Sequence, residues 1–168
     1  MSVKKELEYF ANEVINRSRS NLTQKKKNAS KELYNSLKYD IKVSNKNSFT
    51  LSFSMENYGT FIDKGVKGRD SSLKAPNSPY QFKNKMPPSK VLDKWVIRKG
   101  LKGIRNKKGQ FVSRESLKFA IAKNIQKYGL ETTNFFTKPF ENAFKRLPED
   151  IVKAYALEVE DFLKFTLK

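Results

Sequence analysis

Two short runs of alternating apolar and polar residues, in "YDIKV" and "SFTLSFS", constrain the fold of this chain more than any other feature. The apolar positions are Tyr39, Ile41 and Val43 in the first run and Phe49, Leu51 and Phe53 in the second. Side chains two residues apart lie on the same face of a strand, so each run predicts a strand with one apolar face. A short Asn-rich stretch separates the runs, which predicts an antiparallel β-hairpin.

Apolar residues at helical spacing surround this hairpin and predict amphipathic helices. The predicted helical ranges are 3–20, 31–38, 89–99, 114–128 and 148–163. A length of 168 residues is typical of one domain. The sequence therefore predicts a single α+β domain over residues 1–168, in which several amphipathic helices pack a small antiparallel hairpin or sheet.

Two of these helices make specific predictions about the core. In the range 89–99, Trp95 shares a face with Leu92 and Val96, so we expect its side chain to be buried. In the range 114–128 the predicted inward positions are Leu117, Ala120, Ile121, Asn124, Ile125 and Tyr128.

Positive charge is concentrated in the middle of the chain. The net charge is +18, and residues 64–127 hold 18 Lys and Arg against 3 Asp and Glu, a net +15. Residues 64–112 include most of this excess, in a basic loop or arm region. Such a concentration predicts a polyanionic partner, most plausibly a nucleic acid, although a solvated charged face is the simpler alternative.

The segment 66–88 has no periodicity and contains four prolines. Loops of this length in compact domains usually have a function, so we expect an arm or binding element. The stretch "YGTFIDKGVKGR" precedes it. Its glycines match neither the phosphate-loop nor the dinucleotide spacing, which makes a helix stop at Gly65 the better interpretation.

Composition excludes several kinds of chemistry. The chain has no Cys and no His, which removes disulfides, the usual zinc ligands and the usual general base. No apolar run is long enough to span a membrane, so we expect no membrane partner. No nucleophile–base pair is recognisable, and we expect no catalytic residue, metal or cofactor.

The basic charge and the carboxylates together suggest a metal-dependent nuclease as a less favoured hypothesis. Its candidate carboxylates are Asp63, Asp70, Asp93 and Glu115, with Lys118 three residues after Glu115. The usual carboxylate–lysine pair lies on a strand, whereas Glu115 and Lys118 fall in a predicted helix. An E-x-x-K match is expected by chance in so lysine-rich a chain.

Phe135 and Phe136 are adjacent, followed by Phe140 and Phe144. Two neighbouring side chains cannot both point inward on one regular element. We therefore expect one of the pair to face a neighbouring subunit.

Three blocks together resemble the tail-completion and head–tail connector (neck) proteins of long-tailed double-stranded DNA phages, related to the minor tail protein Z type. They are "YGTFIDKGVKG" at 58–68, "KMPPSKVLDKWVIRKGL" at 85–101 and "SLKFAIAKNIQKYGLETTNFFTKPFENAF" at 116–144. The blocks span about a third of the chain, and their order and spacing resemble that family more than any single motif does.

The resemblance implies a virion structural protein rather than an enzyme. It implies a closed homo-oligomeric ring of six or twelve copies that joins the capsid portal to the tail around the DNA channel. Partners would be other neck, portal or tail proteins and double-stranded DNA, with assembly in the host cytoplasm. The expected structural corner is Tyr58, Phe61, Asp63 and Gly65, and the expected assembly residues are Trp95, Phe135, Phe136 and Phe140.

The sequence also places the DNA-facing residues. Lysines on flexible loops make point-charge contacts with phosphates, and the basic turn before residue 113 holds Lys102, Arg105, Lys107 and Lys108. We expect these four to approach DNA. The main alternative is a free-standing, sequence-nonspecific nucleic-acid-binding protein with the same basic middle.

Overall fold

The predicted hairpin is present in the structure, a computed structural model that describes residues 2–43, 48–101 and 104–153. Strand β1 (Lys38–Val43) pairs antiparallel with β2 (Phe49–Ser54). Tyr39 lies opposite Phe53 and Ile41 opposite Leu51, so the apolar positions share one face, as the alternation predicts. Helices pack against this two-stranded sheet, and the predicted α+β class is confirmed.

Among the described residues, the chain forms two compact units. Unit 1 takes residues 2–25, 32–56 and 135–153, and unit 2 takes residues 26–31 and 57–134. Each unit brings together segments that are distant in sequence. The single domain predicted from the chain length stays a prediction.

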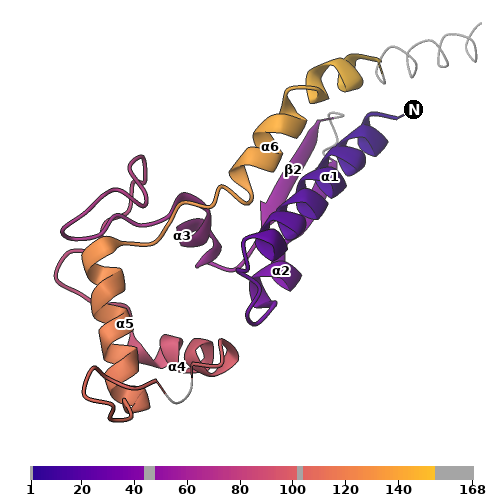
Figure 1. The fold of residues 1–168 in the computed structure, drawn as a ribbon. Coiled ribbons are helices and arrows are strands. Elements are labelled where there is room, and N and C mark those ends of the chain that lie inside the picture. Colours follow the sequence, from indigo (N-terminus) through magenta and orange to yellow (C-terminus); the bar gives the residue numbers. More distant parts are fainter. Residues whose placement is uncertain (1, 44–47, 102–103, 154–168) are drawn as a thin grey trace, which may run out of the picture. The chain divides into compact units, whose positions relative to one another are not determined.

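Unit 1 is built on α1 (Val3–Gln24), which packs against both strands and α6 (Thr137–Phe144) (Figure 1). The helix starts at Ser2, whose Oγ accepts a hydrogen bond from the backbone N–H of Lys5 at 3.4 Å. The buried side chains of α1 follow helical spacing and include Phe10, Ala11, Val14 and Ile15. The predicted amphipathic helix at this end is therefore confirmed.

Phenylalanine rings form the centre of unit 1. The ring of Phe10 meets those of Phe53 and Phe140 edge-on at centroid distances of 6.1 and 5.6 Å. Phe53 also meets Phe136 at 5.4 Å, which joins the sheet to the segment before α6. These separations and tilts are those that aromatic pairs prefer.

Phe135 and Phe136 both belong to this unit, and the expected contact of one of them with a neighbouring subunit stays a prediction. Phe135 is fully buried, and Phe136 is half-buried against the Phe10 core. Both precede α6, and Asn134 before them has a left-handed backbone with φ 49°. The two residues therefore lie on an irregular segment rather than on one regular element, and both can face the core.

Two further helices complete unit 1. The short α2 (Glu32–Ser36) is tied to α1 by Arg19, whose guanidinium donates to the carbonyl oxygens of Tyr34 and Leu37 at 3.1 and 3.0 Å. Residues 147–153 are helical, with Pro148 in the first turn as predicted. The remaining inward positions predicted for that helix, Tyr155, Val159, Phe162 and Leu163, lie outside the described residues.

Unit 2 contains α3 (Gly59–Lys64), α4 (Ser89–Arg98) and α5 (Arg114–Tyr128), with α4 packed on α5. Ser113 caps α5 by accepting from the N–H of Ser116, and Gly129 ends it with φ 78°, both as predicted. Figure 1 shows α5 running between the 65–82 loop at one end and a tight turn at the other.

Trp95 and the face of α5 differ from expectation. The Trp95 side chain is 38 % exposed, whereas Leu92 and Val96 are buried. On α5 the buried side chains are Lys118, Ala122 and Gln126, and the predicted inward residues Ala120, Asn124 and Tyr128 are exposed. The predicted Leu117, Ile121 and Ile125 are half-buried beside this stripe. Polar side chains can be buried here because they have partners, as the next section describes.

The loop over residues 65–82 is folded, so this part of the 66–88 segment, expected to be an arm or a binding element, is not a free arm. Val66 exchanges backbone hydrogen bonds with Leu130 at 3.0 and 2.8 Å, and the N–H of Lys67 donates to Tyr80. Ala75 is fully buried, and buried Ser78 donates its hydroxyl to the carbonyl oxygen of Gly65 at 2.7 Å. An aperiodic sequence can thus be fixed by backbone pairing without a regular apolar pattern.

Candidate nucleic-acid interface

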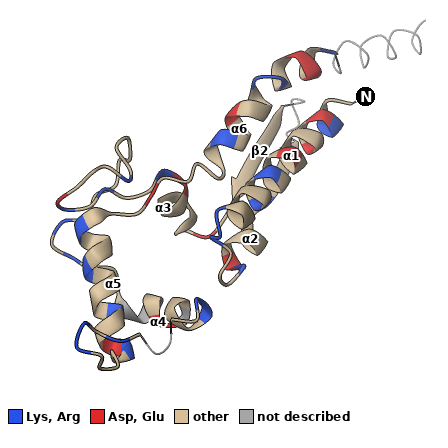
Figure 2. Cartoon of the chain, viewed as in Figure 1, with Lys and Arg blue, Asp and Glu red and all other residues tan. Residues whose placement is uncertain are grey.

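Positive charge divides unequally between the two units. By sequence count, residues 26–31 and 57–134 of unit 2 hold 21 Lys and Arg against 5 Asp and Glu, a net +16. All other residues together hold 14 and 12, a net +2. In Figure 2, the cartoon is blue at several Lys and Arg positions along α5 and on the turn before it, and few positions beside them are red. Unit 2 is therefore the candidate surface for a polyanion.

The turn that precedes α5 spans residues 104–112 and is internally braced. Its ends pair through the N–H of Val112, which donates to the carbonyl oxygen of Ile104 at 2.8 Å. At the tip, the side-chain oxygen of Asn106 accepts from the N–H groups of Lys108 and Gln110 at 2.9 and 3.0 Å. Gly109 supplies the left-handed residue with φ 75°. The predicted basic turn is confirmed as a turn.

Arg105 stabilises this turn. Its guanidinium lies 4.2 Å from the centre of the Phe111 ring and donates to the carbonyl oxygen of Gly109 at 2.9 Å. Lys107 and Lys108 are exposed at the tip, and neither forms an ion pair within the described part of the chain. The structure thus brings together three of the four predicted DNA-facing residues, and Lys102 lies outside the described residues. We call Arg105, Lys107 and Lys108 the turn cluster.

A second basic group gathers at the other end of α5. The N–H groups of Arg69 and Asp70 donate to the carbonyl oxygens of Gln126 and Lys127 at 2.8 and 3.0 Å. The side chain of Gln126 donates to the carbonyl oxygen of Lys83 at 3.0 Å. These bonds bring the loop against the last turn of α5, so the backbone of Lys67 and Lys83 lies beside the end of the helix that carries Lys123 and Lys127. We call Lys67, Lys83, Lys123 and Lys127 the loop cluster.

Glycines permit this close approach. A Cβ on Gly68 would collide with the carbonyl oxygen of Lys127, and one on Gly129 would collide with the carbonyl oxygen of Val66. Both obstacles are backbone atoms, which cannot rotate away. Gly68 and Gly129 follow no recognisable spacing in the sequence, so the contact that they allow between the loop and α5 is not predicted. The loop cluster, which depends on that contact, is not predicted either.

Arg69 contributes less charge to this end than its neighbours. It forms two hydrogen bonds with Asp70, at 2.7 and 3.3 Å. The hydrogen bond from Arg69 lowers the pKa of the Asp70 carboxyl, so that the carboxylate stays charged beside its partner. The pair is formally neutral, and for this reason Arg69 is not counted in the loop cluster.

The exposed face of α5 connects the two clusters. Residues 116, 120, 123 and 127 follow one another at spacings of three or four and are all exposed, so Lys123 and Lys127 share one side of the helix. Phe119 and Tyr128 flank this stripe and are 55 % and 42 % exposed. The ammonium of Lys127 lies 5.1 Å from the centre of the Tyr128 ring. Unit 2 therefore presents cations interleaved with exposed aromatic rings.

Lys118 lies on the opposite side of α5, in an ion cluster. Its buried ammonium is 2.6 Å from a Glu115 oxygen and 3.2 Å from an Asp93 oxygen, which ties α5 to α4. Arg114 approaches the same Asp93 carboxylate at 3.9 Å. The hydrogen bond with Glu115 is the main cause that raises the pKa of Lys118 above its usual value.

This cluster bears on the nuclease hypothesis. Two of the four candidate carboxylates of that hypothesis, Asp93 and Glu115, lie close together. The partner that they share is the Lys118 ammonium, which lies between them. Asp70 pairs with Arg69, and Asp63 is buried near Thr133, whose N–H donates to the Asp63 carbonyl oxygen at 3.1 Å. Within residues 2–43, 48–101 and 104–153, no three His, Cys, Asp or Glu side chains gather as a metal site would require.

The expected structural corner is present. Gly65 ends α3 with φ 70°, and an added Cβ there would lie 2.7 Å from the Leu130 carbonyl oxygen. Asp63 and Gly65 are buried. Tyr58 and Phe61 are 40 % and 41 % exposed, and the carbonyl oxygen of Tyr58 accepts hydrogen bonds from the N–H groups of Phe61 and Ile62. The Phe61 ring meets Tyr80 edge-on at 4.8 Å.

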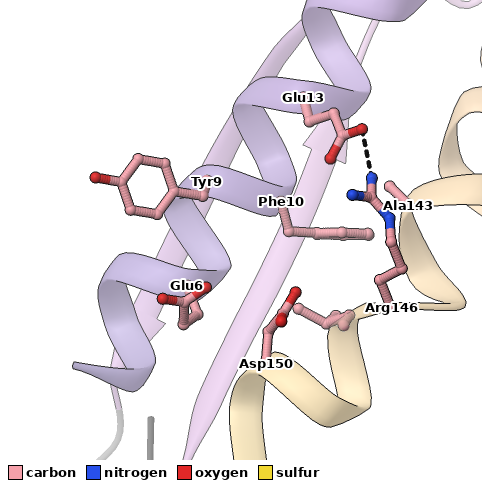
Figure 3. A pocket seen from close by; sticks show the side chains of 8 residues that line it. Glu6, Tyr9, Phe10, Glu13, Ala143, Arg146 and Asp150 are labelled. Carbon is pink, nitrogen blue, oxygen red and sulfur yellow. Dashed lines mark hydrogen bonds and ion pairs between the residues drawn. The ribbon is translucent and has the colours of Figure 1, made fainter. Parts of the chain in front are cut away.

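Unit 1 has a small pocket between α1 and residues 143–150, shown in Figure 3. An ion pair of 2.6 Å joins Arg146 to Glu13 across it, and the carboxylates of Glu6 and Asp150 also line it. The space open to water there is about 60 Å³, far below what a small-molecule site occupies. Its negative lining would repel phosphates, so the candidate interface does not extend into this pocket.

Comparisons with known proteins give no family. No protein-family model matches the chain, and neither the curated proteins nor the solved structures contain a significant match. Among the described helices, none combines the length and apolar character needed to cross a bilayer.

Proposed function

We propose that this chain is a structural protein of the phage neck, part of a ring that joins the capsid portal to the tail and surrounds the DNA. The observation that most supports the proposal is the partition of charge, net +16 on unit 2 against net +2 elsewhere. A lumen that DNA must traverse favours a chain whose positive charge is concentrated in one unit.

Exposed apolar side chains support assembly. In unit 2 the large side chains that are at least 38 % exposed include Trp95, Ile97, Phe111 and Phe119. The buried apolar side chains of the same unit are mostly smaller, Val66, Ala75, Leu92, Val96 and Ala122. Large apolar side chains that remain exposed on such a unit are typical of proteins that associate. Rotationally symmetric neighbours such as a portal and a tail favour six or twelve copies.

The turn cluster is the proposed DNA contact, as the sequence predicts, and the loop cluster joins it. Their lysines are exposed or half-buried side chains that can neutralise phosphates without reading bases. Only part of the positive charge can serve this role, because six copies would hold six times +18, and an excess of that size would hold DNA in place. The remaining cations would contact acidic neighbours.

Analytical ultracentrifugation of the purified chain tests the ring. We expect a species of six or twelve copies, so that a hexamer has about six times the 19.5 kDa mass of one chain. Dispersal to monomers by Trp95→Ala with an unchanged fold would agree with assembly through exposed apolar side chains. A wild-type monomer at tens of micromolar that binds DNA would favour the alternative, a free-standing nonspecific nucleic-acid-binding protein.

A further inference from the structure

The two basic clusters of unit 2 lie at opposite ends of one rigid element. The turn that carries the turn cluster ends immediately before Ser113, the N-cap of α5. The loop that carries part of the loop cluster is hydrogen-bonded through its backbone to the last turn of the helix. With 15 residues, α5 is about 22 Å long at 1.5 Å per residue. Lys123 and Lys127 lie nine and thirteen residues after Arg114, so about 14–20 Å of helix separates the loop cluster from the turn.

Both ends are fixed rather than flexible. The turn is closed by the Ile104–Val112 and Asn106–Gln110 hydrogen bonds and by the stacking of Arg105 on Phe111. The loop is fixed to α5 by backbone bonds at Gln126 and Lys127, and Gly68 and Gly129 allow the contact. Along the helix, the buried Lys118 is neutralised by Glu115 and Asp93, so it adds no positive charge between the ends.

From this arrangement we propose that unit 2 recognises duplex DNA by two-ended contact, with the turn cluster on one phosphate backbone and the loop cluster on the other. The proposal rests on the proposed DNA-lining function and adds a preference that charge alone does not give. A duplex presents two phosphate backbones at a fixed separation, on either side of a major groove about 12 Å wide. A single strand has one backbone and no fixed shape.

Two contacts on one rigid element act as a linked pair. Once one cluster has bound, the other meets the second backbone at high effective concentration, but only when the spacing of the phosphates matches. Both clusters should therefore increase the affinity for a duplex, whereas the second cluster should increase the affinity for a single strand by less. Removal of either cluster should reduce the preference for the duplex as well as the affinity.

The test uses three pairs of exposed lysines, each replaced by glutamine in the full chain. Lys107→Gln with Lys108→Gln removes charge from the turn cluster, and Lys123→Gln with Lys127→Gln removes it from the loop cluster. Lys38→Gln with Lys42→Gln is the control, because these exposed lysines lie on the hairpin of unit 1. Every pair lowers the net charge by two. Trp fluorescence and circular dichroism establish that each variant is folded.

Fluorescence anisotropy would compare a 15-base-pair duplex with a single strand of the same number of phosphates, at several salt concentrations. We expect the wild-type chain to bind the duplex about 10-fold more tightly, and either cluster pair to reduce this ratio to about 3-fold or less. Each cluster pair should also reduce the salt slope for the duplex by about 1.8, which is 0.9 for each lost phosphate contact. The control pair should change neither quantity appreciably.

Two results would overturn the two-ended contact. One is equal affinity of the wild-type chain for duplex and single strand. The other is a cluster pair that weakens both ligands by the same factor and so leaves the ratio unchanged. A wild-type chain that binds neither DNA would instead contradict the DNA-lining function itself, so the two failures are distinguishable.

Discussion

Alanine substitutions at three glycines would measure how firmly the loop cluster is held in place. Gly68 lacks a left-handed backbone, but an added Cβ would collide with the backbone of Lys127. Gly109 has φ 75° and open space around it. Gly129 combines φ 78° with a collision against the backbone of Val66. Gly68→Ala therefore measures the steric cost alone, Gly109→Ala the conformational cost alone, and Gly129→Ala both costs together.

The expected magnitudes follow from this geometry. Gly109→Ala should cost about 1–2 kcal/mol, the penalty of a left-handed backbone. Gly68→Ala should cost about 1–3 kcal/mol, the usual cost of overpacking, because the obstructing atoms are backbone and the loop must shift. Gly129→Ala combines both effects and should cost roughly 2–5 kcal/mol.

Urea unfolding followed by tryptophan fluorescence is the appropriate assay. Trp95 is the single tryptophan of the chain and lies in unit 2, so its emission reports the unit that contains all three glycines. The order of destabilisation should place Gly129→Ala above both of the other variants. If Gly68→Ala had no effect, or if Gly129→Ala cost no more than Gly109→Ala, the loop would not be held against α5 as described.

Three further predictions concern unit 2. Trp95→Ala should lower the free energy of unfolding by about 1 kcal/mol, because the side chain is 38 % exposed, whereas loss of a buried tryptophan costs roughly 3–5 kcal/mol. Urea unfolding followed by circular dichroism measures this cost, and a value in the higher range would place Trp95 in the core. Deletion of residues 70–80 should abolish cooperative unfolding of unit 2, since it removes buried Ala75 and Ser78. A cooperative transition like that of the intact chain would show that the loop is a free arm. The raised pKa of Lys118 means that its ion pairs stabilise the fold fully below the unfolded value of 10.5 and that this contribution is lost as pH rises through the higher folded value. The urea midpoints of the wild type and of Lys118→Met should therefore converge only as the pH rises above about 10.5, and a difference that stays constant there would contradict the assignment.

Local signals in the sequence are sufficient for part of the fold. The hairpin follows from period-two alternation over Tyr39–Val43 and Phe49–Phe53, and the structure pairs the two strands antiparallel. The helix stops at Gly65 and Gly129 and the cap at Ser113 are equally local, because each depends on one residue and its immediate backbone.

Non-local contacts explain what the sequence does not predict. The 65–82 loop is fixed by backbone hydrogen bonds to residues more than forty positions away, and backbone pairing leaves no side-chain pattern. The buried side of α5 contains Lys118 and Gln126, which look like surface residues until their partners Asp93, Glu115 and Lys83 are in place. The loop cluster depends on both features, whereas the turn cluster is contiguous in sequence and could be predicted.

Quantitative mass spectrometry of purified virions tests the central proposal most directly. The particles would come from the phage that, under this proposal, encodes the chain, and labelled peptides would give the copy number relative to the portal protein. A neck ring predicts the chain in intact particles at six or twelve copies per virion, retained after nuclease treatment and high-salt washing. Absence of the chain from particles that contain portal and tail proteins at normal stoichiometry would contradict the proposal.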